Sequence, residues 1–209
     1  VFKETDDALG FNLSQIIFNG PDEALRDTIN AQPAILTVSI ATYEAWKEQM
    51  GDKNVNSMFN AGHSLGEYSA LVAAGVLTFS DAVRLVRERG TLMKQANKKR
   101  PGAMAAISGL DEEALDHICA ETGVEIASFN TDEQIVISGD KRAIARAMDL
   151  SSIRGARRIT RLAVSGAFHS SFMEMARDGL IQAISEIDFK RPNVPIIGNS
   201  TAEVLTQPE

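Results

Sequence analysis

The chain has 209 residues, of which 44% are hydrophobic and 23% charged, and its formal net charge is −7. These proportions are those of a soluble globular protein with one domain, or one domain and a small insert, and the acidic balance argues against nucleic acid as a partner. No apolar run reaches membrane-spanning length, so we expect neither a membrane span nor a signal peptide. The single cysteine, Cys119, excludes an internal disulfide and a multi-thiolate metal site and fits a reducing cytoplasm. We expect it to be a small buried residue rather than a nucleophile.

Residues 1–30 carry little pattern, apart from a break at residues 19–21 and a short capped helix predicted for residues 22–26. From Gln32-Pro33 onward, apolar residues recur with a helical period as far as Trp46. This period predicts a helix whose main role is to pack the core.

Residues 60–68 read Asn-Ala-Gly-His-Ser-Leu-Gly-Glu-Tyr and contain a Gly-X-Ser-X-Gly pattern centred on Ser64. An apolar run with Val55, Met58, Phe59 and Ala61 precedes the pattern, and an Ala-rich stretch ending at Gly75 follows it. This setting predicts a strand, a sharp turn and a buried helix, which together form a nucleophile elbow that lifts Ser64 out of regular structure. Such a turn leaves no room for side chains at Gly62 and Gly66. The alternative is an ordinary turn of small residues.

An amphipathic helix is predicted over residues 82–93, and Arg89 lies close to its inward-facing stripe. By base rate alone this arginine would be a solvated helix residue.

Beyond the basic break at residues 98–102, the periodicity changes to strand, helix, strand, strand, helix and strand over roughly 65 residues, which is the ferredoxin-like order. The predicted elements in that order are residues 103–107, 112–121, 124–129, 134–139, 141–150 and a strand within 156–164.

The chain contains three histidines. His63 lies inside the elbow, where its side chain must point away from that of Ser64, and His117 lies in a polar helix. His169 is therefore the candidate general base, at a junction between a loop and an amphipathic helix. Residues 193–201 form a predicted short buried strand that ends in a polar turn.

Four stretches together resemble the acyltransferase family of fatty-acid and polyketide synthesis. They are Gly-His-Ser-Leu-Gly-Glu at residues 62–67, Gln-Pro-Ala-Ile at 32–35, Arg-Gly at 89–90 and Gly-Ala-Phe-His-Ser at 166–170. The resemblance implies an α/β fold, in which an α/β-hydrolase-like body with a parallel sheet carries an inserted ferredoxin-like subdomain. The body would comprise residues 1–100 and 166–209, and the subdomain residues 101–165.

The resemblance also implies the roles of individual residues. Ser64 would be the nucleophile, His169 its base and the backbone N–H of Leu65 an oxyanion donor. Arg89, 25 residues after Ser64, would bind the free carboxylate of a malonyl group, which suits its fixed fork of donors. Phe168 would fill the space that a methyl branch on the substrate would need. The remaining candidates for the pocket are His63, Asn130 and Asn199, although Asn130 is equally well explained as a hairpin-turn residue.

The implied reaction moves malonyl from coenzyme A to the phosphopantetheine thiol of acyl carrier protein, with no tightly bound cofactor, no metal and no membrane. An acidic enzyme needs a local basic face for an acidic carrier protein, and the candidate clusters are Lys94, Lys98, Lys99 and Arg100, or Arg154, Arg157, Arg158 and Arg161. The family's opening strand with its Gly-Gln-Gly loop and its C-terminal part have no counterpart here, so we expect weak activity and poor stability of this chain alone. The rival functions are a serine hydrolase such as a thioesterase, and a non-catalytic docking module.

Overall fold

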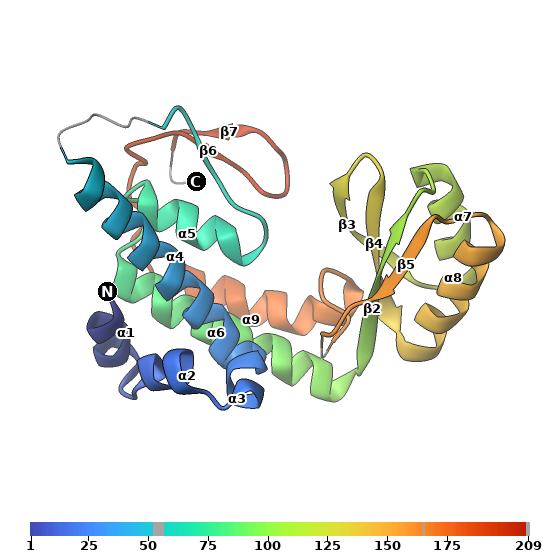
Figure 1. Cartoon of the computed structure of the whole chain (residues 1–209), viewed down its shortest axis with the longest axis horizontal. Coiled ribbons are helices and arrows are strands. Elements are labelled where there is room, and N and C mark those ends of the chain that lie inside the picture. The colour runs from blue at the N-terminus through green and yellow to red at the C-terminus, as the bar shows by residue number, and fades with distance from the viewer. Residues whose placement is uncertain (52–56, 165, 208–209) are drawn as a thin grey trace. The chain divides into compact units, whose positions relative to one another are not determined.

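The computed structural model describes residues 1–51, 57–164 and 166–207. The chain is a mixed α/β protein that divides into two compact units (Figure 1). The first unit contains Val1–Thr91 and Ile181–Glu209, and the second contains Leu92–Leu180. Among the described residues, no helix combines the length and the apolar character needed to cross a bilayer.

Within its described residues, six helices begin in the first unit: α1 (Phe2–Leu9), α2 (Leu13–Asn19), α3 (Asp22–Arg26), α4 (Thr28–Met50), α5 (Leu65–Ala73) and α6 (Phe79–Lys99). Helix α4 starts before the predicted Gln32-Pro33, because Asp27 caps it by accepting the N–H of Ile29 at 3.2 Å. Pro33 therefore lies inside the helix and cannot donate to the carbonyl of Ile29. Arg87 of α6 donates to that carbonyl instead, at 3.3 Å, which compensates for the missing helical bond.

The core of the first unit lies among α4, α5 and α6, where Leu36, Leu65, Val83 and Val86 are buried together. Helix α6 approaches the start of α4 closely at Gly90, since a Cβ atom there would lie 2.6 Å from the carbonyl oxygen of Thr28. This close approach brings the neighbouring residue of α6, Arg89, beside the first turns of α4. The predicted amphipathic helix is confirmed and is longer at both ends.

A small sheet in the first unit holds β1 (Asn60–Ala61), β6 (Ile196–Ile197) and β7 (Val204–Leu205) in the order β1-β6-β7. Strand β1 pairs with β6 in parallel, whereas β6 and β7 form an antiparallel hairpin, so the pairing is mixed where a parallel sheet was expected. The strand before the elbow is only two residues long. Met58 and Phe59 are exposed rather than buried in it, and Val55 lies outside the described residues.

The second unit is built on a four-stranded antiparallel sheet in the order β3-β4-β2-β5. Its elements follow the chain order predicted from periodicity: β2 (Gly102–Ser108), α7 (Glu112–Thr122), β3 (Glu125–Thr131), β4 (Gln134–Asp140), α8 (Lys141–Ile153) and β5 (Arg158–Arg161). Helices α7 and α8 cover one face of the sheet (Figure 1). The core between these layers includes Ile107, Leu115, Ile118, Ile137 and Ile144, all fully buried. A short 3₁₀ turn, η1 (Ser171–Met173), then leads into α9 (Glu174–Ser185).

Candidate active site

Ser64 lies in the turn between β1 and α5, with φ 53° and ψ −110°. A residue other than glycine rarely adopts a positive φ, and such strain costs about 1–3 kcal/mol and persists only where the surroundings enforce it. The predicted strand, sharp turn and helix are therefore present, with Ser64 at the N-cap of α5. The Ser64 side chain makes no capping hydrogen bond with the helix, so its hydroxyl is directed to other partners.

The two glycines that flank Ser64 do not have the same role. A Cβ atom at Gly62 would overlap the backbone of Gly66 and Glu67, so the turn can close only with glycine at this position. A Cβ atom at Gly66 would meet nothing within 4 Å, and Gly66 does not have a positive φ. The expectation that the turn excludes a side chain at both positions is therefore correct for Gly62 and wrong for Gly66, because only Gly62 faces the start of α5.

The backbone amides of the elbow are almost all engaged. The N–H of Gly66 donates to the carbonyl of His63 at 2.8 Å, and that of Glu67 donates to the carbonyl of Ser64 at 3.2 Å. The N–H of Ser64 donates to Oδ1 of Asn199 at 2.8 Å. For the N–H of Leu65, at the start of α5, the described part of the chain supplies no acceptor. Such an amide at the positive end of a helix is suited to donate a hydrogen bond to an oxyanion that forms during a reaction.

Arg89 reaches Ser64 from the middle of α6. Its Nη2 donates to Oγ of Ser64 at 3.0 Å, and its Nη1 donates to Oε1 of Gln32 at 2.6 Å. Gln32 is buried on α4, and its Nε2 donates in turn to Oγ1 of Thr28 at 3.0 Å. The guanidinium is thus held in one orientation beside the candidate nucleophile. This places Arg89 at the site rather than on a solvated helix face.

The surroundings of Arg89 are partly apolar. Its Cζ lies 5.8 Å from the centroid of the Tyr68 ring. Burial lowers the pKa of the Arg89 guanidinium below its usual range, and the charges of Tyr68 and Glu67 act in the opposite direction. Burial also raises the pKa of the Tyr68 hydroxyl, an effect that Arg89 opposes. At neutral pH the site therefore offers a charged guanidinium beside a neutral phenol, an arrangement that favours an anion.

Asn199 lies in the turn between β6 and β7, and it is brought to the elbow from 135 residues away. Besides accepting the N–H of Ser64, it donates its own backbone N–H to Oε1 of Glu67 at 2.9 Å. The side chain of Asn199 therefore contacts the backbone of the elbow. Sequence reasoning missed this contact and the partnership of Gln32 with Arg89, although the Gln-Pro-Ala-Ile wording at residues 32–35 had already marked Gln32.

His169, Phe168 and Asn130 belong to the second unit. His169 is exposed and has φ 56°, in a loop just before η1. The loop is fixed at Ser171, whose backbone N–H and Oγ donate to the two carboxylate oxygens of Glu125 at 2.9 and 2.6 Å. Within the loop, Oγ of Ser170 donates to the carbonyl of Ala167 at 2.8 Å. These bonds define the path of the segment that carries the candidate base.

The other candidate residues have local surroundings of their own. Phe168 packs against two apolar clusters of the second unit, centred on Met93 and Met104. Asn130 lies in β3, where it accepts from Ser128 at 3.1 Å and donates to Gln134 at 3.0 Å, both within the β3–β4 hairpin.

The remaining histidines and the cysteine differ in burial. His63 and His117 are exposed. Cys119 is half-buried against the core of the second unit, and its thiol has a pKa raised to about 11, chiefly by burial and further by Asp116 and Glu125. A thiol with so high a pKa is almost fully protonated at neutral pH, which agrees with a packing role for Cys119.

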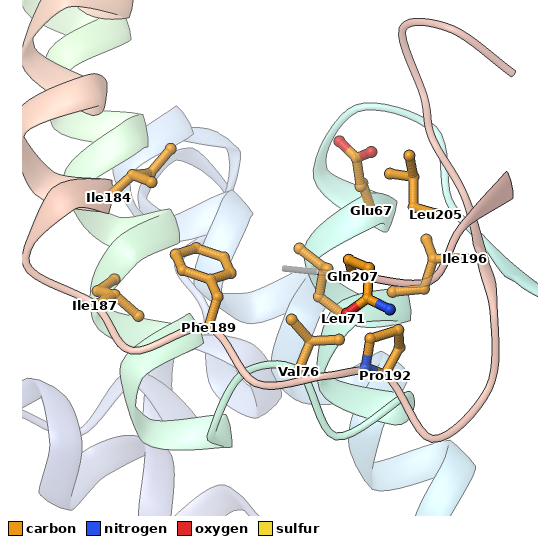
Figure 2. Close-up of a pocket in the computed structure, with 10 residues that line it drawn as sticks. All are labelled: Glu67, Leu71, Val76, Ile184, Ile187, Phe189, Pro192, Ile196, Leu205 and Gln207. Carbon is orange, nitrogen blue, oxygen red and sulfur yellow. The ribbon is translucent and has the colours of Figure 1, made fainter. Parts of the chain in front are cut away.

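A pocket of about 530 Å³ lies elsewhere in the first unit (Figure 2). Most of its lining is apolar, with Glu67 and Gln207 as the polar exceptions; the apolar residues are Leu71, Val76, Ile184, Ile187, Phe189, Pro192, Ile196 and Leu205. Neither Ser64 nor Arg89 lines this pocket. It therefore adds apolar surface to the unit but no reactive group.

Residues 2–209 match the family described as acyl transferase domain, and the chain belongs to this family. It is similar to the malonyl CoA-acyl carrier protein transacylase of Bacillus subtilis, with 46% identity over 99% of this chain and 66% of the relative. It is also 44% identical to the transacylase of the same name from Escherichia coli K12, over 95% of this chain and 64% of the relative. The chain thus spans about two thirds of the length of these relatives.

Solved structures give the same result. The malonyl CoA-acyl carrier protein transacylase of Coxiella burnetii matches with a TM-score of 0.93 and 38% identity, over 99% of this chain and 66% of that one. A malonyl-transacylase solved in complex with the acyl carrier protein of a type II polyketide synthase matches with a TM-score of 0.93 and 40% identity, over 99% of this chain and 67% of that one.

Proposed function

We propose that this protein transfers a malonyl group from coenzyme A to the phosphopantetheine thiol of an acyl carrier protein, for fatty-acid or polyketide synthesis. The observation that carries the proposal is the 3.0 Å contact between Nη2 of Arg89 and Oγ of Ser64. A guanidinium one hydrogen bond away from an elbow hydroxyl can hold the carboxylate of an acid-tailed thioester while the hydroxyl meets its acyl carbon. The names of the relatives support the same substrate and partner.

The reaction proceeds in two half-reactions. In the first, His169 takes the proton of Ser64, Oγ bonds to the thioester carbon, and the N–H of Leu65 donates to the oxyanion. The carbon–sulfur bond then breaks, and coenzyme A leaves as a thiol with the proton from His169. In the second, His169 takes the proton of the carrier protein's thiol, whose sulfur attacks the malonyl ester. The carbon–oxygen bond breaks and Oγ recovers its proton.

Arg89 selects the acyl group in this mechanism. Its fork exchanges the contact with Ser64 for the malonyl carboxylate, while Gln32 keeps the guanidinium in place. An acetyl thioester has no such anion and gains nothing from Arg89. Phe168 restricts branching next to the thioester, and His63 and Asn130 remain candidate pocket residues. Asn199 instead contacts the backbone of the elbow.

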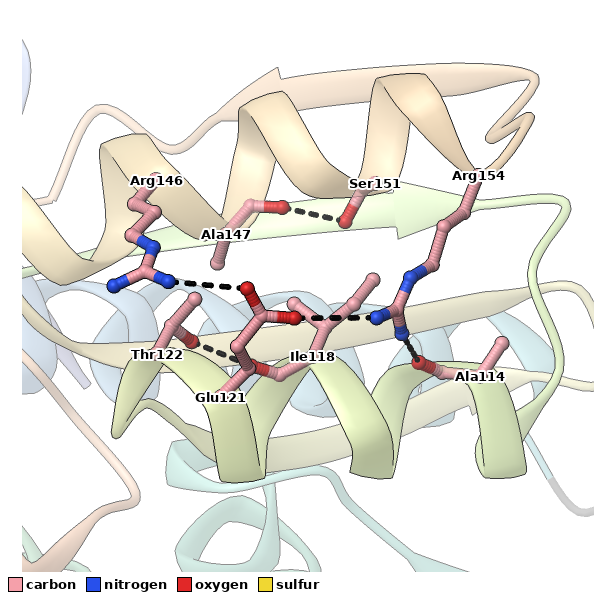
Figure 3. Close-up of polar contacts among 8 residues, drawn as sticks. All are labelled: Ala114, Ile118, Glu121, Thr122, Arg146, Ala147, Ser151 and Arg154. Carbon is pink, nitrogen blue, oxygen red and sulfur yellow. Dashed lines mark hydrogen bonds and ion pairs between the residues drawn. The ribbon is translucent and has the colours of Figure 1, made fainter.

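The carrier protein docks on a basic face of the second unit. Of the two candidate clusters, the arginine cluster is partly neutralised: Arg154 pairs with Glu121, which also binds Arg146 (Figure 3), and Arg157 pairs with Glu133. The cluster at the end of α6 has exposed lysines, Lys98 and Lys99, and is the stronger candidate. Replacing both lysines by glutamate should raise the carrier protein's KM and leave that of malonyl-CoA unchanged.

The finer architecture follows the same family. Residues 1–100 and 166–209 form an α/β-hydrolase-like body, supported by the elbow between β1 and α5 and by the parallel pairing of β1 with β6. Residues 101–165 form a ferredoxin-like subdomain, supported by the strand order β3-β4-β2-β5 with two helices on one face. The single cysteine, Cys119, is a free thiol, which suits a reducing cytoplasm as the site of the reaction.

Intact mass after incubation with malonyl-CoA tests the proposal. We expect one malonyl adduct on the chain, no adduct on Ser64→Ala, and transfer of the group when a carrier protein with its phosphopantetheine arm is added. A serine hydrolase would release malonate to water with no need for the carrier protein and would respond little to Arg89→Ala. A docking module would form no adduct, and that result would contradict the proposal.

A further inference from the structure

We propose that Asn199 is a positioning residue for the nucleophile: it holds the elbow at the backbone of Ser64, and Glu67 holds Asn199. This inference deepens the proposed function, since it concerns the same site. It also replaces the view of Asn199 as a pocket residue, because its Oδ1 is already engaged by the N–H of Ser64 at 2.8 Å.

Ser64, Asn199 and Glu67 are joined in a closed ring of three hydrogen bonds, which we call the bracket. Asn199 receives the N–H of Ser64 on its side chain and gives its own backbone N–H to Oε1 of Glu67 at 2.9 Å. Glu67 lies in the first turn of α5, three residues after Ser64, and its N–H donates to the carbonyl of Ser64 at 3.2 Å. The turn between β6 and β7 is thereby attached at two points to the segment that runs from the elbow into α5.

The bracket acts where the backbone most needs restraint. Ser64 has a positive φ, which an unrestrained serine would leave. Rotation of the peptide groups around Ser64 would move both its Oγ and the N–H of Leu65, because both are built on the same few bonds. Asn199 engages the amide of Ser64 and leaves that of Leu65 as the donor for the oxyanion. One side chain therefore fixes the nucleophile and its oxyanion donor together.

The chemistry of the bracket explains why an amide occupies position 199. An aspartate could also accept the N–H of Ser64, but its charge would lie beside Glu67 and beside the developing oxyanion. The neutral Asn199 provides the acceptor without this repulsion. Glu67 needs only an acceptor oxygen toward Asn199, a role that glutamine can fill.

The test compares Asn199→Ala, Glu67→Ala, their double variant and Glu67→Gln, with Ser200→Ala on the same exposed turn as the matched control. Two reagents report on Ser64: malonyl-CoA, and a fluorophosphonate that requires a reactive serine but no carboxylate recognition. We expect Asn199→Ala to slow acylation by both reagents by a factor on the order of 10 to 100, with an unchanged half-saturating concentration of malonyl-CoA. The double variant should lose no more than Asn199→Ala. Glu67→Gln, which keeps an acceptor oxygen, should lose less than Glu67→Ala, and Ser200→Ala should react like the parent chain.

A second readout follows the hydrogen bond itself. Amide hydrogen exchange at Ser64, measured by NMR, should be faster in Asn199→Ala and unchanged in Ser200→Ala. Three results for Asn199→Ala would each overturn the inference. They are an unchanged exchange rate at the Ser64 amide, acylation at the rate of the parent chain, and an effect confined to the half-saturating concentration of malonyl-CoA. If the parent chain reacts with the fluorophosphonate but not with malonyl-CoA, the proposed function fails and the fluorophosphonate still decides on Asn199. If it reacts with neither, the exchange rate at Ser64 decides.

Discussion

Gln32 accepts a hydrogen bond of 2.6 Å from Nη1 of Arg89, across the interface between α4 and α6. The acceptor is a neutral amide, so it orients the guanidinium without cancelling its charge. A carboxylate in this place would form an ion pair with Arg89 and compete with any anionic substrate. The neutrality of Gln32 is therefore as important for an anion receptor as its position.

Replacing Arg89 should remove the preference for malonyl over acetyl thioesters. We expect Arg89→Ala to lower kcat/KM for malonyl-CoA by a factor on the order of 100, since a hydrogen-bonded charge pair contributes about 1.5–3 kcal/mol, and to leave the slow reaction with acetyl-CoA unchanged. The matched control is Arg84→Ala, which removes an exposed arginine of the same helix that pairs with Asp81. Equal losses with the two thioesters would contradict the role of Arg89.

Changing Gln32 to glutamate should weaken malonyl binding without loss of fold. The new carboxylate would pair with Arg89, so we expect KM for malonyl-CoA to rise on the order of tenfold while kcat changes little. Steady-state kinetics measure this split. Gln49→Glu introduces the same charge at an exposed position of the same helix and should have no effect. If both variants raised KM alike, the effect would come from net charge rather than from the contact with Arg89.

The two glycines of the elbow should differ in their tolerance of a side chain. Gly62→Ala places a Cβ atom against the backbone of Gly66 and Glu67, so we expect a loss of several kcal/mol in the free energy of unfolding. Gly66→Ala places the same atom in open space near the start of a helix, and the free energy of unfolding should stay constant or rise by about 0.4–1 kcal/mol. Thermal or urea unfolding monitored by circular dichroism compares the two, and equal destabilisation would be inconsistent with the described turn.

The loop that carries His169 should depend on Glu125. Glu125→Ala removes both acceptors of Ser171, so we expect a decrease in the rate of Ser64 acylation on the order of tenfold, because the candidate base loses its fixed loop. Ser171→Ala removes only the hydroxyl donor and should have a smaller effect. Glu133→Ala, which breaks an exposed ion pair with Arg157 in the same unit, serves as the control. A parent-like rate in Glu125→Ala would show that the hydrogen bonds between Ser171 and Glu125 have no part in the reaction.

The raised pKa of Cys119 has a consequence for stability. The pKa of this thiol is about 11 in the folded chain against an ordinary value of 9.0, so between these two pH values the unfolded chain releases a proton that the folded chain keeps. Folding stability should therefore fall as the pH rises from about 9 to about 11. Other groups titrate in this range, so the measurement is the difference between the parent chain and Cys119→Ala in unfolding experiments at each pH. The same pKa predicts slow alkylation of the thiol at neutral pH, and rapid alkylation of the folded chain would argue against it.

Local patterns were sufficient to predict most elements and the elbow itself. The Gly-X-Ser-X-Gly spacing with its apolar flanks predicted the turn at Ser64, and the change of periodicity after residue 101 predicted the strands and helices of the second unit. These signals are local, since each depends on residues a few positions apart. The same reasoning set the start of α4 too late, because the proline signal outweighed the cap at Asp27 and the compensating bond from Arg87 is distant in sequence.

The contacts that complete the site were beyond a local pattern. Asn199 meets Ser64 from 135 residues away, and Gln32 meets Arg89 from 57 residues away. The sequence position of an asparagine in a polar turn, or of a glutamine before a proline, does not predict which distant residue it will contact. The family wording marked both residues, but the bonds they make follow from the packing of α4 against α6 and of the β6–β7 turn against the elbow.

The hydrogen bond between Asn199 and Ser64 also determines when, during synthesis of the chain, the elbow can be completed. A ribosome makes the chain from its N-terminus, so Ser64 is synthesised 135 residues before Asn199, which accepts its N–H. Until the β6–β7 hairpin is made and docks, the nascent polypeptide lacks the side-chain acceptor for the amide of Ser64. The elbow that we propose as the site of acylation can therefore be completed only after the ribosome has added Asn199.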